Sequence, residues 1–172
     1  MNAPLETSRL TLRPFEIEDA EVAFRWFGNP LVMRFTPNGP DNGPGQTAER
    51  IARYQKHQSM YGYSRWMILD RISREPIGDI GLMHVPEYGW IDFGYRLAQP
   101  FWGKGLATEA ASAWLDKAFG ELQLDRLVAF SHPNNSASIK VLRKLGFSEE
   151  RRDTIMGMDS LVFLIIPATR RK

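Results

Sequence analysis

The chain has 172 residues, of which 43% are hydrophobic, and its 22 basic and 20 acidic side chains give a formal net charge of +2. This length and composition predict one globular domain over residues 1–172 and exclude an extensively disordered chain. The absence of cysteine excludes disulfides, thiolate metal sites, iron–sulfur clusters and a cysteine nucleophile.

Further classes are excluded by local features. The histidines His57, His84 and His132 do not pair at metal-ligand spacing, so no metal site is expected. No apolar run approaches the roughly 18–20 residues of a membrane-spanning helix. Residues 1–6 lack the pattern of a secretory signal, so we expect a cytoplasmic protein that binds no membrane. The basic residues 170–172 are typical of a solvated chain end rather than a nucleic-acid site.

The first third of the chain predicts a strand, a helix, a loop and a second helix. Residues 9–13 alternate as a strand and stop at Pro14, and residues 19–27 carry an apolar helical face. Residues 36–45 contain three prolines and three glycines, which predict a long loop. Thr47 is then expected to cap a helix that runs to about Tyr61.

Three strands are expected next, over residues 66–69, 77–85 and 91–97, with a polar turn at 71–75 between the first two. The third strand alternates, so its apolar and its other side chains should lie on opposite faces of a sheet. These two sets are Ile91, Phe93, Tyr95 and Leu97 on one face, and Asp92, Gly94 and Arg96 on the other.

The second half of the chain completes a mixed α/β pattern with one sheet. Residues 106–119 place an alanine-rich stripe with Trp114 on one helical face. Residues 127–130 are apolar throughout, as in a central strand that is covered on both sides. Residues 136–145 form a second helical pattern that stops at Gly146, and residues 160–166 predict a last strand.

A glycine-containing turn lies between the strand that ends at Leu97 and the helix at 106–119. Two glycines let the backbone approach a ligand, and the free amides of a helix start favour phosphate. A mononucleotide P-loop is excluded because Lys104 is followed by Gly105, and a dinucleotide fingerprint is not matched at Thr108. Coenzyme A, whose pyrophosphate docks on this kind of turn, is the remaining class.

With these residues the chain resembles the GNAT superfamily of acyl-CoA-dependent N-acetyltransferases, and within it the RimJ/RimL-like branch, which includes acetylators of ribosomal-protein amino termini. The resemblance runs from residues 7–14 to the last strand and rests mainly on residues 101–110, 135–138 and 145–147, with a weaker match at 77–82. It implies a mixed, mostly antiparallel sheet flanked by helices on both faces. It also implies acetyl-CoA as acyl donor without a metal, and homodimers are common in this branch.

The same resemblance implies roles for individual residues. The pantetheine arm would bind along Tyr95, Arg96 and Leu97 and contact the Asn135 side chain. Ser138 would lie near the thioester sulfur and hydrogen-bond or protonate the departing thiolate, since residues 136–145 contain no tyrosine, which many members of the family place there. The pyrophosphate would bind the backbone of Trp102, Gly103, Lys104, Gly105, Leu106, Ala107 and Thr108.

The general base is expected at Asp92, a position that the resemblance matches to a frequent glutamate. His84, Asp79, Glu87 and a relaying water are alternatives, and Asp92 can instead form a salt bridge with Arg96. An α-amino group is about 10–20% neutral at pH 7, whereas a lysine is below about 0.1% neutral. The lack of one obvious base therefore favours an α-amine acceptor. Without cysteine, direct attack of the amine is favoured over an acyl-enzyme.

The acceptor remains open among a protein amino terminus, an amino acid, a polyamine and an amino-sugar antibiotic. The loop 36–45 and the aromatic residues Trp26, Tyr61, Tyr63 and Trp66 line the acceptor side or pack in the core. An alternative function is a non-catalytic acyl-CoA-binding sensor or scaffold, and a weaker one is a nucleotide-binding protein.

Overall fold

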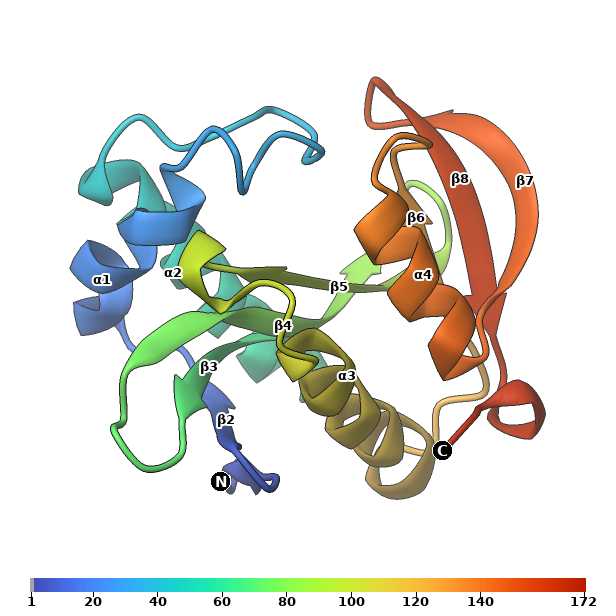
Figure 1. Cartoon of the computed structure of the whole chain (residues 1–172), viewed down its shortest axis with the longest axis horizontal. Helices are drawn as coiled ribbons and strands as arrows, with labels where there is room; N and C mark the ends of the chain where they lie inside the picture. Colours follow the sequence, from blue (N-terminus) through green and yellow to red (C-terminus); the bar gives the residue numbers. More distant parts are fainter. Residues whose placement is uncertain (1) are drawn as a thin grey trace.

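The computed structural model describes residues 2–172, and its centre is one eight-stranded sheet (Figure 1). Only β5 and β6 run parallel, and all other neighbours are antiparallel, which confirms the mixed, mostly antiparallel sheet. In the order β1-β2-β3-β4-β5-β6-β8-β7, the strands are β1 (Leu5–Glu6), β2 (Leu10–Pro14), β3 (Arg65–Asp70), β4 (Pro76–Val85), β5 (Trp90–Leu97), β6 (Leu127–Ser131), β8 (Met158–Ile165) and β7 (Ser148–Ile155).

Helices cover both faces of this sheet. On one face lie α1 (Ala20–Phe27) and α2 (Pro44–Tyr61), and on the other lie α3 (Leu106–Asp116) and α4 (Ser136–Leu145). The alternation along β3 shows the two layers directly. Trp66 and Ile68 pack in the core beneath α3, whereas Met67 and Leu69 pack in the core beneath α1 and α2.

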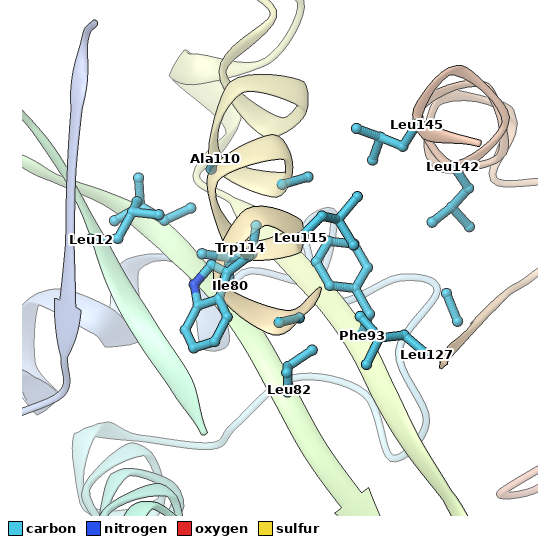
Figure 2. Packing of buried hydrophobic residues seen from close by; sticks show 14 of the residues in the cluster. Leu12, Ile80, Leu82, Phe93, Ala110, Trp114, Leu115, Leu127, Leu142 and Leu145 are labelled. Carbon is cyan, nitrogen blue, oxygen red and sulfur yellow. The ribbon is translucent and has the colours of Figure 1, made fainter. Parts of the chain in front are cut away.

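The core beneath α3 is built by the stripe that the sequence predicts. Ala110, Ala111, Trp114 and Ala118 are fully buried, and the Trp114 indole meets the Trp66 indole edge-on with centroids 5.0 Å apart. Figure 2 shows Trp114 and Leu115 of α3 pointing toward side chains of the sheet and of α4. The helix ends at Asp116 and continues as one π-helical turn, Lys117–Glu121.

The start of α2 corrects a sequence prediction. The helix begins at Pro44 rather than near Thr47, because the fixed φ of proline suits the first helical position and its missing N–H needs no partner there. Thr47 is therefore not the cap. Its hydroxyl is buried and donates to the Asp41 carboxylate at 2.9 Å.

Two further segments differ from expectation. Strand β7 is not predicted from the sequence, because its residues are all exposed except Ile155, and an edge strand without a buried face has no hydrophobic alternation. Of the carboxy-terminal residues 170–172, Arg171 and Lys172 are exposed as expected, whereas Arg170 is not. The Arg170 side chain is buried, forms an ion pair with Asp116 and donates to the Ser112 carbonyl and hydroxyl at 3.0 Å.

No helix within residues 2–172 combines the length and the apolar composition needed to cross a bilayer.

Candidate functional site

A cavity of about 130 Å³ opens where β5 and β6 part. The two strands share one registered pair, Asp92 with Val128, whereas β4 and β5 remain in register from Gly78 with Leu97 to Val85 with Trp90. Beyond the shared pair, residues 94–96 and 129–131 line the cavity. Their backbone edges have no ladder partner across the gap, and such groups need a hydrogen-bond partner. The gap therefore presents backbone donors and acceptors to a ligand.

The cavity connects both faces of the sheet. Side chains of β5 alternate, so Tyr95 lies on the α3 and α4 face, while Asp92 and Arg96 lie on the α1 and α2 face, as the sequence predicts. Ser131, at the end of β6, contributes a buried hydroxyl that has no hydrogen-bond partner. An orphaned polar atom in a cavity wall indicates a place for a ligand or a water.

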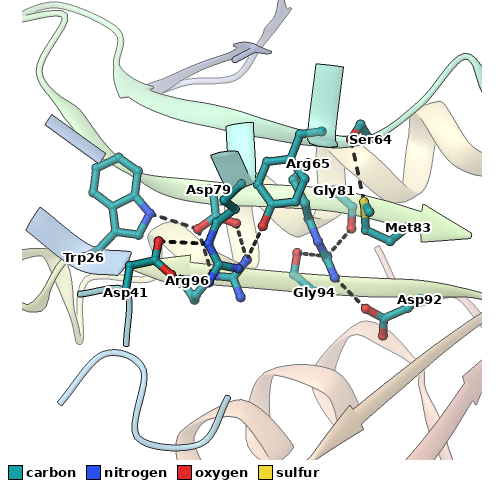
Figure 3. Close-up of polar contacts among 12 residues, drawn as sticks. Trp26, Asp41, Ser64, Arg65, Asp79, Gly81, Met83, Asp92, Gly94 and Arg96 are labelled. Atoms are coloured by element: carbon teal, nitrogen blue, oxygen red, sulfur yellow. Dashed lines mark hydrogen bonds and ion pairs between the residues drawn. The ribbon is translucent and has the colours of Figure 1, made fainter. Parts of the chain in front are cut away.

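The Asp92 carboxylate is held by Arg65, which the sequence analysis did not identify. Arg65, Gly81 and Gly94 lie in one row across β3, β4 and β5, so the two glycines leave room for the arginine side chain. Its Nη1 donates to the carbonyls of Gly81 (2.6 Å) and Gly94 (2.7 Å), and its Nη2 donates to Asp92 Oδ2 at 2.5 Å (Figure 3). Burial raises the pKa of Asp92, although the Arg65 charge opposes this shift.

The alternative of a salt bridge between Asp92 and Arg96 is wrong in its partner, because Asp92 is bound by Arg65. Arg96 instead binds the fully buried Asp79 with two hydrogen bonds, from Nε to Oδ1 (3.0 Å) and from Nη2 to Oδ2 (2.7 Å). Asp79 also accepts from the Trp26 indole at 3.0 Å, so its carboxylate is occupied on both oxygens. Asp79 is consequently a structural anion and does not line the cavity.

The other two alternatives for the base also lie outside the cavity. The backbone N–H of His84 donates to His57 Nε2 at 2.9 Å, and the His84 ring lies tilted against Tyr61 with centroids 4.9 Å apart. Glu87 is exposed in the turn after β4. Among the four side chains that the sequence analysis considered, Asp92 is the one in the cavity wall.

Two hydroxyl groups meet on the opposite face of the gap. The Tyr95 hydroxyl donates to Ser138 Oγ at 3.5 Å, so a tyrosine of β5 lies beside the serine of α4. Burial raises the pKa of Tyr95, which keeps its proton on the phenol. Asn135 caps α4, because its Oδ1 accepts from the Ser138 N–H at 3.3 Å, and its side chain also lines the cavity.

The glycine turn follows β5 through the 3₁₀ turn Gln99–Phe101 and leads into α3. Gly103 and Gly105 have φ values of 73° and 76°, which side chains rarely adopt, and a Cβ at Gly103 would meet nothing within 4 Å. Lys104 is exposed beside the Phe101 ring. The open left-handed backbone, the free helix amides and the lysine fit a pyrophosphate group.

Contacts from outside the turn hold it in place. The Arg9 guanidinium donates to the Lys104 carbonyl (3.0 Å) and to Glu109 Oε2 (2.7 Å) in the first turn of α3. The Trp102 indole donates to the Leu97 carbonyl at 2.8 Å, so that carbonyl is already occupied.

The loop between α1 and α2 forms part of the cavity wall. Phe35 stacks on His132 with ring centroids 5.1 Å apart and thereby joins this loop to the segment after β6. Of the expected loop 36–45, Thr36 and Pro37 line the cavity. The aromatic residues that the sequence analysis considered lie elsewhere: Trp26 and Trp66 are core residues, and Tyr61 and Tyr63 pack on His57.

Comparison with known proteins gives consistent matches. Residues 9–148 match the family described as an acetyltransferase (GNAT) domain. The chain is 34% identical over 147 residues to the uncharacterized N-acetyltransferase p20 of Bacillus licheniformis, covering 85% of this chain and 83% of that protein. It is 30% identical over 140 residues to spermidine N(1)-acetyltransferase of Escherichia coli strain K12. This match covers 81% of this chain and 73% of that protein. The fold matches the structure of RimL, a ribosomal L7/L12 alpha-N-protein acetyltransferase in complex with coenzyme A. The TM-score is 0.82 at 18% sequence identity, and the match covers 95% of this chain and 98% of the RimL chain.

Proposed function

Because this chain belongs to the GNAT acetyltransferase family, we propose that it transfers an acetyl group from acetyl-CoA directly to a primary amine. One observation carries the proposal: the cavity between β5 and β6 has a carboxylate on one face of the sheet and two hydroxyls on the other. The amine would approach from the α1 and α2 face, where Asp92 lies. The thiolate would leave on the α4 face, beside Ser138 and Tyr95.

The acyl donor would bind along the glycine turn and the parted strands. The backbone from Trp102 to Thr108 would hold the pyrophosphate, with Lys104 as a charged contact. The edge from Tyr95 to Leu97 and the side chains of Asn135 and Ser131 would hold the pantetheine arm. The RimL structure, which has the same fold, contains coenzyme A, and this supports coenzyme A as the ligand class.

On the acceptor side, Asp92 would take the proton that the amine must lose, either directly or through a water. The amine nitrogen then forms the new C–N bond at the thioester carbonyl as the C–S bond breaks. An N–H on the open edge of β5 would stabilise the negative charge that develops on the carbonyl oxygen. Arg65 fixes the Asp92 carboxylate in the cavity wall and so sets where the proton is received.

On the leaving-group side, Ser138 would hydrogen-bond the sulfur and pass it a proton from Tyr95. Tyr95 would then recover its proton from solvent. Because the chain contains no cysteine, an acyl-cysteine intermediate has no residue on which to form, which supports direct transfer.

The acceptor class is part of the proposal. We favour an α-amine, as in the RimJ/RimL-like branch, because an α-amine needs little help from a base and Asp92 is already bound to Arg65. Such a substrate also fits an enzyme of the cytoplasm. The spermidine relative supports a polyamine as the alternative acceptor.

The test is thiol release from acetyl-CoA with peptides of varied amino termini, amino acids, polyamines and aminoglycosides. The protein has no thiol of its own, so the background is low. Release with one class of amine would support transfer and identify the acceptor. If no amine of the panel causes thiol release but coenzyme A still raises the melting temperature, the result would support the sensor or scaffold function instead. If there is no thiol release and coenzyme A does not raise the melting temperature, the proposed donor site would be refuted.

A further inference from the structure

The Arg96 guanidinium is held by further contacts in addition to its ion pair with Asp79. Asp79 binds its Nε and Nη2, and Nη2 also donates to the Tyr54 hydroxyl at 3.3 Å. The guanidinium carbon lies 5.0 Å from the centroid of the Phe27 ring, so one face of the group is covered. These contacts fix the plane of the guanidinium relative to β5.

One amino group of this guanidinium is left over. No acceptor within residues 2–172 binds Nη1 of Arg96. The Arg96 side chain is 15% exposed, and the residue lines the cavity. Arg96 lies on the same face of β5 as Asp92, the face from which the amine would approach. A residue of the cavity wall therefore carries a fixed, charged donor without a partner among the described residues, on the face from which the amine would approach.

The charges of the cavity wall favour an oxygen at this donor. The charged side chains in the wall are Arg65, Asp92 and Arg96, and the one carboxylate is already bound by Arg65. Each guanidinium of the wall is balanced by the carboxylate that it binds, so the wall offers the several positive charges of a polyamine no free carboxylate. An acceptor with a carbonyl or carboxylate next to its amine-bearing carbon would instead give Nη1 a charge-assisted hydrogen bond.

We infer that Arg96 determines acceptor specificity by donating from Nη1 to the oxygen of an α-amino carbonyl compound, which is a free amino acid or the amino terminus of a peptide. This inference rests on the proposed function and narrows its acceptor class. Arg96 acts by binding and orienting the acceptor, and it takes no part in proton transfer.

The test compares alaninamide with isopropylamine, which lacks only the carboxamide, in the wild-type enzyme and in Arg96→Lys. A lysine ammonium can still pair with Asp79 but cannot present a second fixed donor to the cavity. We expect kcat/KM for alaninamide to fall roughly 10- to 100-fold, the effect of one charge-assisted hydrogen bond, with little change for isopropylamine. Comparing each substrate across the two enzymes cancels the different pKa values of the amines.

Arg50→Lys is the matched control. Its guanidinium lies over the same Phe27 ring, 4.7 Å from the centroid, and binds Asp41, but Arg50 does not line the cavity. We expect this variant to keep the ratio of the two substrates. Free alanine and an alanine-initiated peptide, assayed in parallel, separate an amino-acid acceptor from a peptide acceptor.

Equal losses on alaninamide and isopropylamine in Arg96→Lys would overturn the role of Arg96. The wild-type enzyme gives a second test if that variant does not fold. At equal concentrations of neutral amine, a preference for isopropylamine or spermidine over alaninamide would also overturn it. Absence of thiol release with every amine would refute the proposed function itself, which is a distinguishable result.

Discussion

Arg65 reaches Asp92 by lying over Gly94, in the space that a side chain at that position would occupy. A Cβ built on Gly94 would be 2.7 Å from Arg65 Nη1 and 2.8 Å from Nη2. The carboxylate of β5 is thus positioned by a residue of β3, two strands away in the sheet. The position of the proposed base depends on three strands together.

Gly94→Ala should therefore disturb the site more than the fold. The new methyl group displaces the guanidinium from its ion pair with Asp92, and overpacking of this kind costs about 1–3 kcal/mol of unfolding free energy. We expect kcat to fall at least about tenfold if Asp92 is the base. Gly45→Ala, where a Cβ meets nothing within 4 Å, should leave both values close to wild type. Unchanged kcat in Gly94→Ala would show that the Arg65 contact is dispensable.

Asp92→Asn tests the base assignment directly. The amide can still accept from Arg65 but cannot take a proton, so we expect kcat to fall about 10²-fold with an α-amine, the lower end of the range for a general base, and further with a lysine acceptor. Burial raises the pKa of Asp92, so wild-type activity should decline as pH falls through that pKa and the carboxylate becomes protonated. The variant should lack this decline and keep only that of the amine itself. Glu87→Gln, on the exposed turn, is the control, and efficient lysine acetylation by Asp92→Asn would refute the assignment.

Tyr95→Phe and Ser138→Ala test the leaving-group side. If the two hydroxyls act as one relay, removing either should lower kcat, and the double variant should be little worse than the more affected single one. Affinity for coenzyme A should change less than kcat. Rates of single turnover for the four proteins give the coupling free energy, and strictly additive losses would argue against a relay.

Gly103→Ala tests the glycine turn against a matched position. Gly103 and Gly157 have φ values of 73° and 79°, and a Cβ at either meets nothing within 4 Å, so alanine should cost about 1–2 kcal/mol of stability at both. Gly157 lies in the turn between β7 and β8 and should keep normal affinity for coenzyme A. Calorimetry should show at least a roughly tenfold weaker Kd for Gly103→Ala, and equal affinities would place the pyrophosphate elsewhere.

His57 predicts a stability change below neutral pH. Its Nδ1–H donates to the Tyr63 carbonyl (2.7 Å) while Nε2 accepts from the His84 N–H, an arrangement that requires the neutral ring. Burial lowers the pKa of His57 below 6.5, so the unfolded chain takes up this proton first. Stability should thus decline as pH falls below about 6.5. Melting curves of His57→Gln should show a shallower decline, and His132→Gln is the control. Parallel curves for His57→Gln and wild type would exclude this role.

The elements that the sequence predicts well are those with a local signal. The β5 alternation and the helix that ends at Gly146 follow from spacing within one segment, and both are present in the structure. The start of α2 is harder to predict, because proline both breaks helices and begins them, and Pro44 begins this one ahead of Thr47. The charged strand β7 has no pattern to detect, because it buries almost nothing.

The site was less predictable because its contacts join distant segments. Nothing within residues 91–97 indicates that Asp92 binds Arg65 rather than Arg96, since that choice depends on the register of three strands. The glycines Gly81 and Gly94 were the available signal, because paired glycines in neighbouring strands leave room for a long side chain. Tyr95 approaches Ser138 only through the packing of α4 on β5.

The two outer strands of the sheet have a consequence for the behaviour of the protein at high concentration. One edge is β1, with two residues, and the other is β7, where Arg151 and Arg152 form exposed ion pairs with Asp153 and Asp159. A second copy that extended the sheet would find too short a template on one side and would have to desolvate this charged strand on the other. Edge-to-edge aggregation through either outer strand is therefore disfavoured.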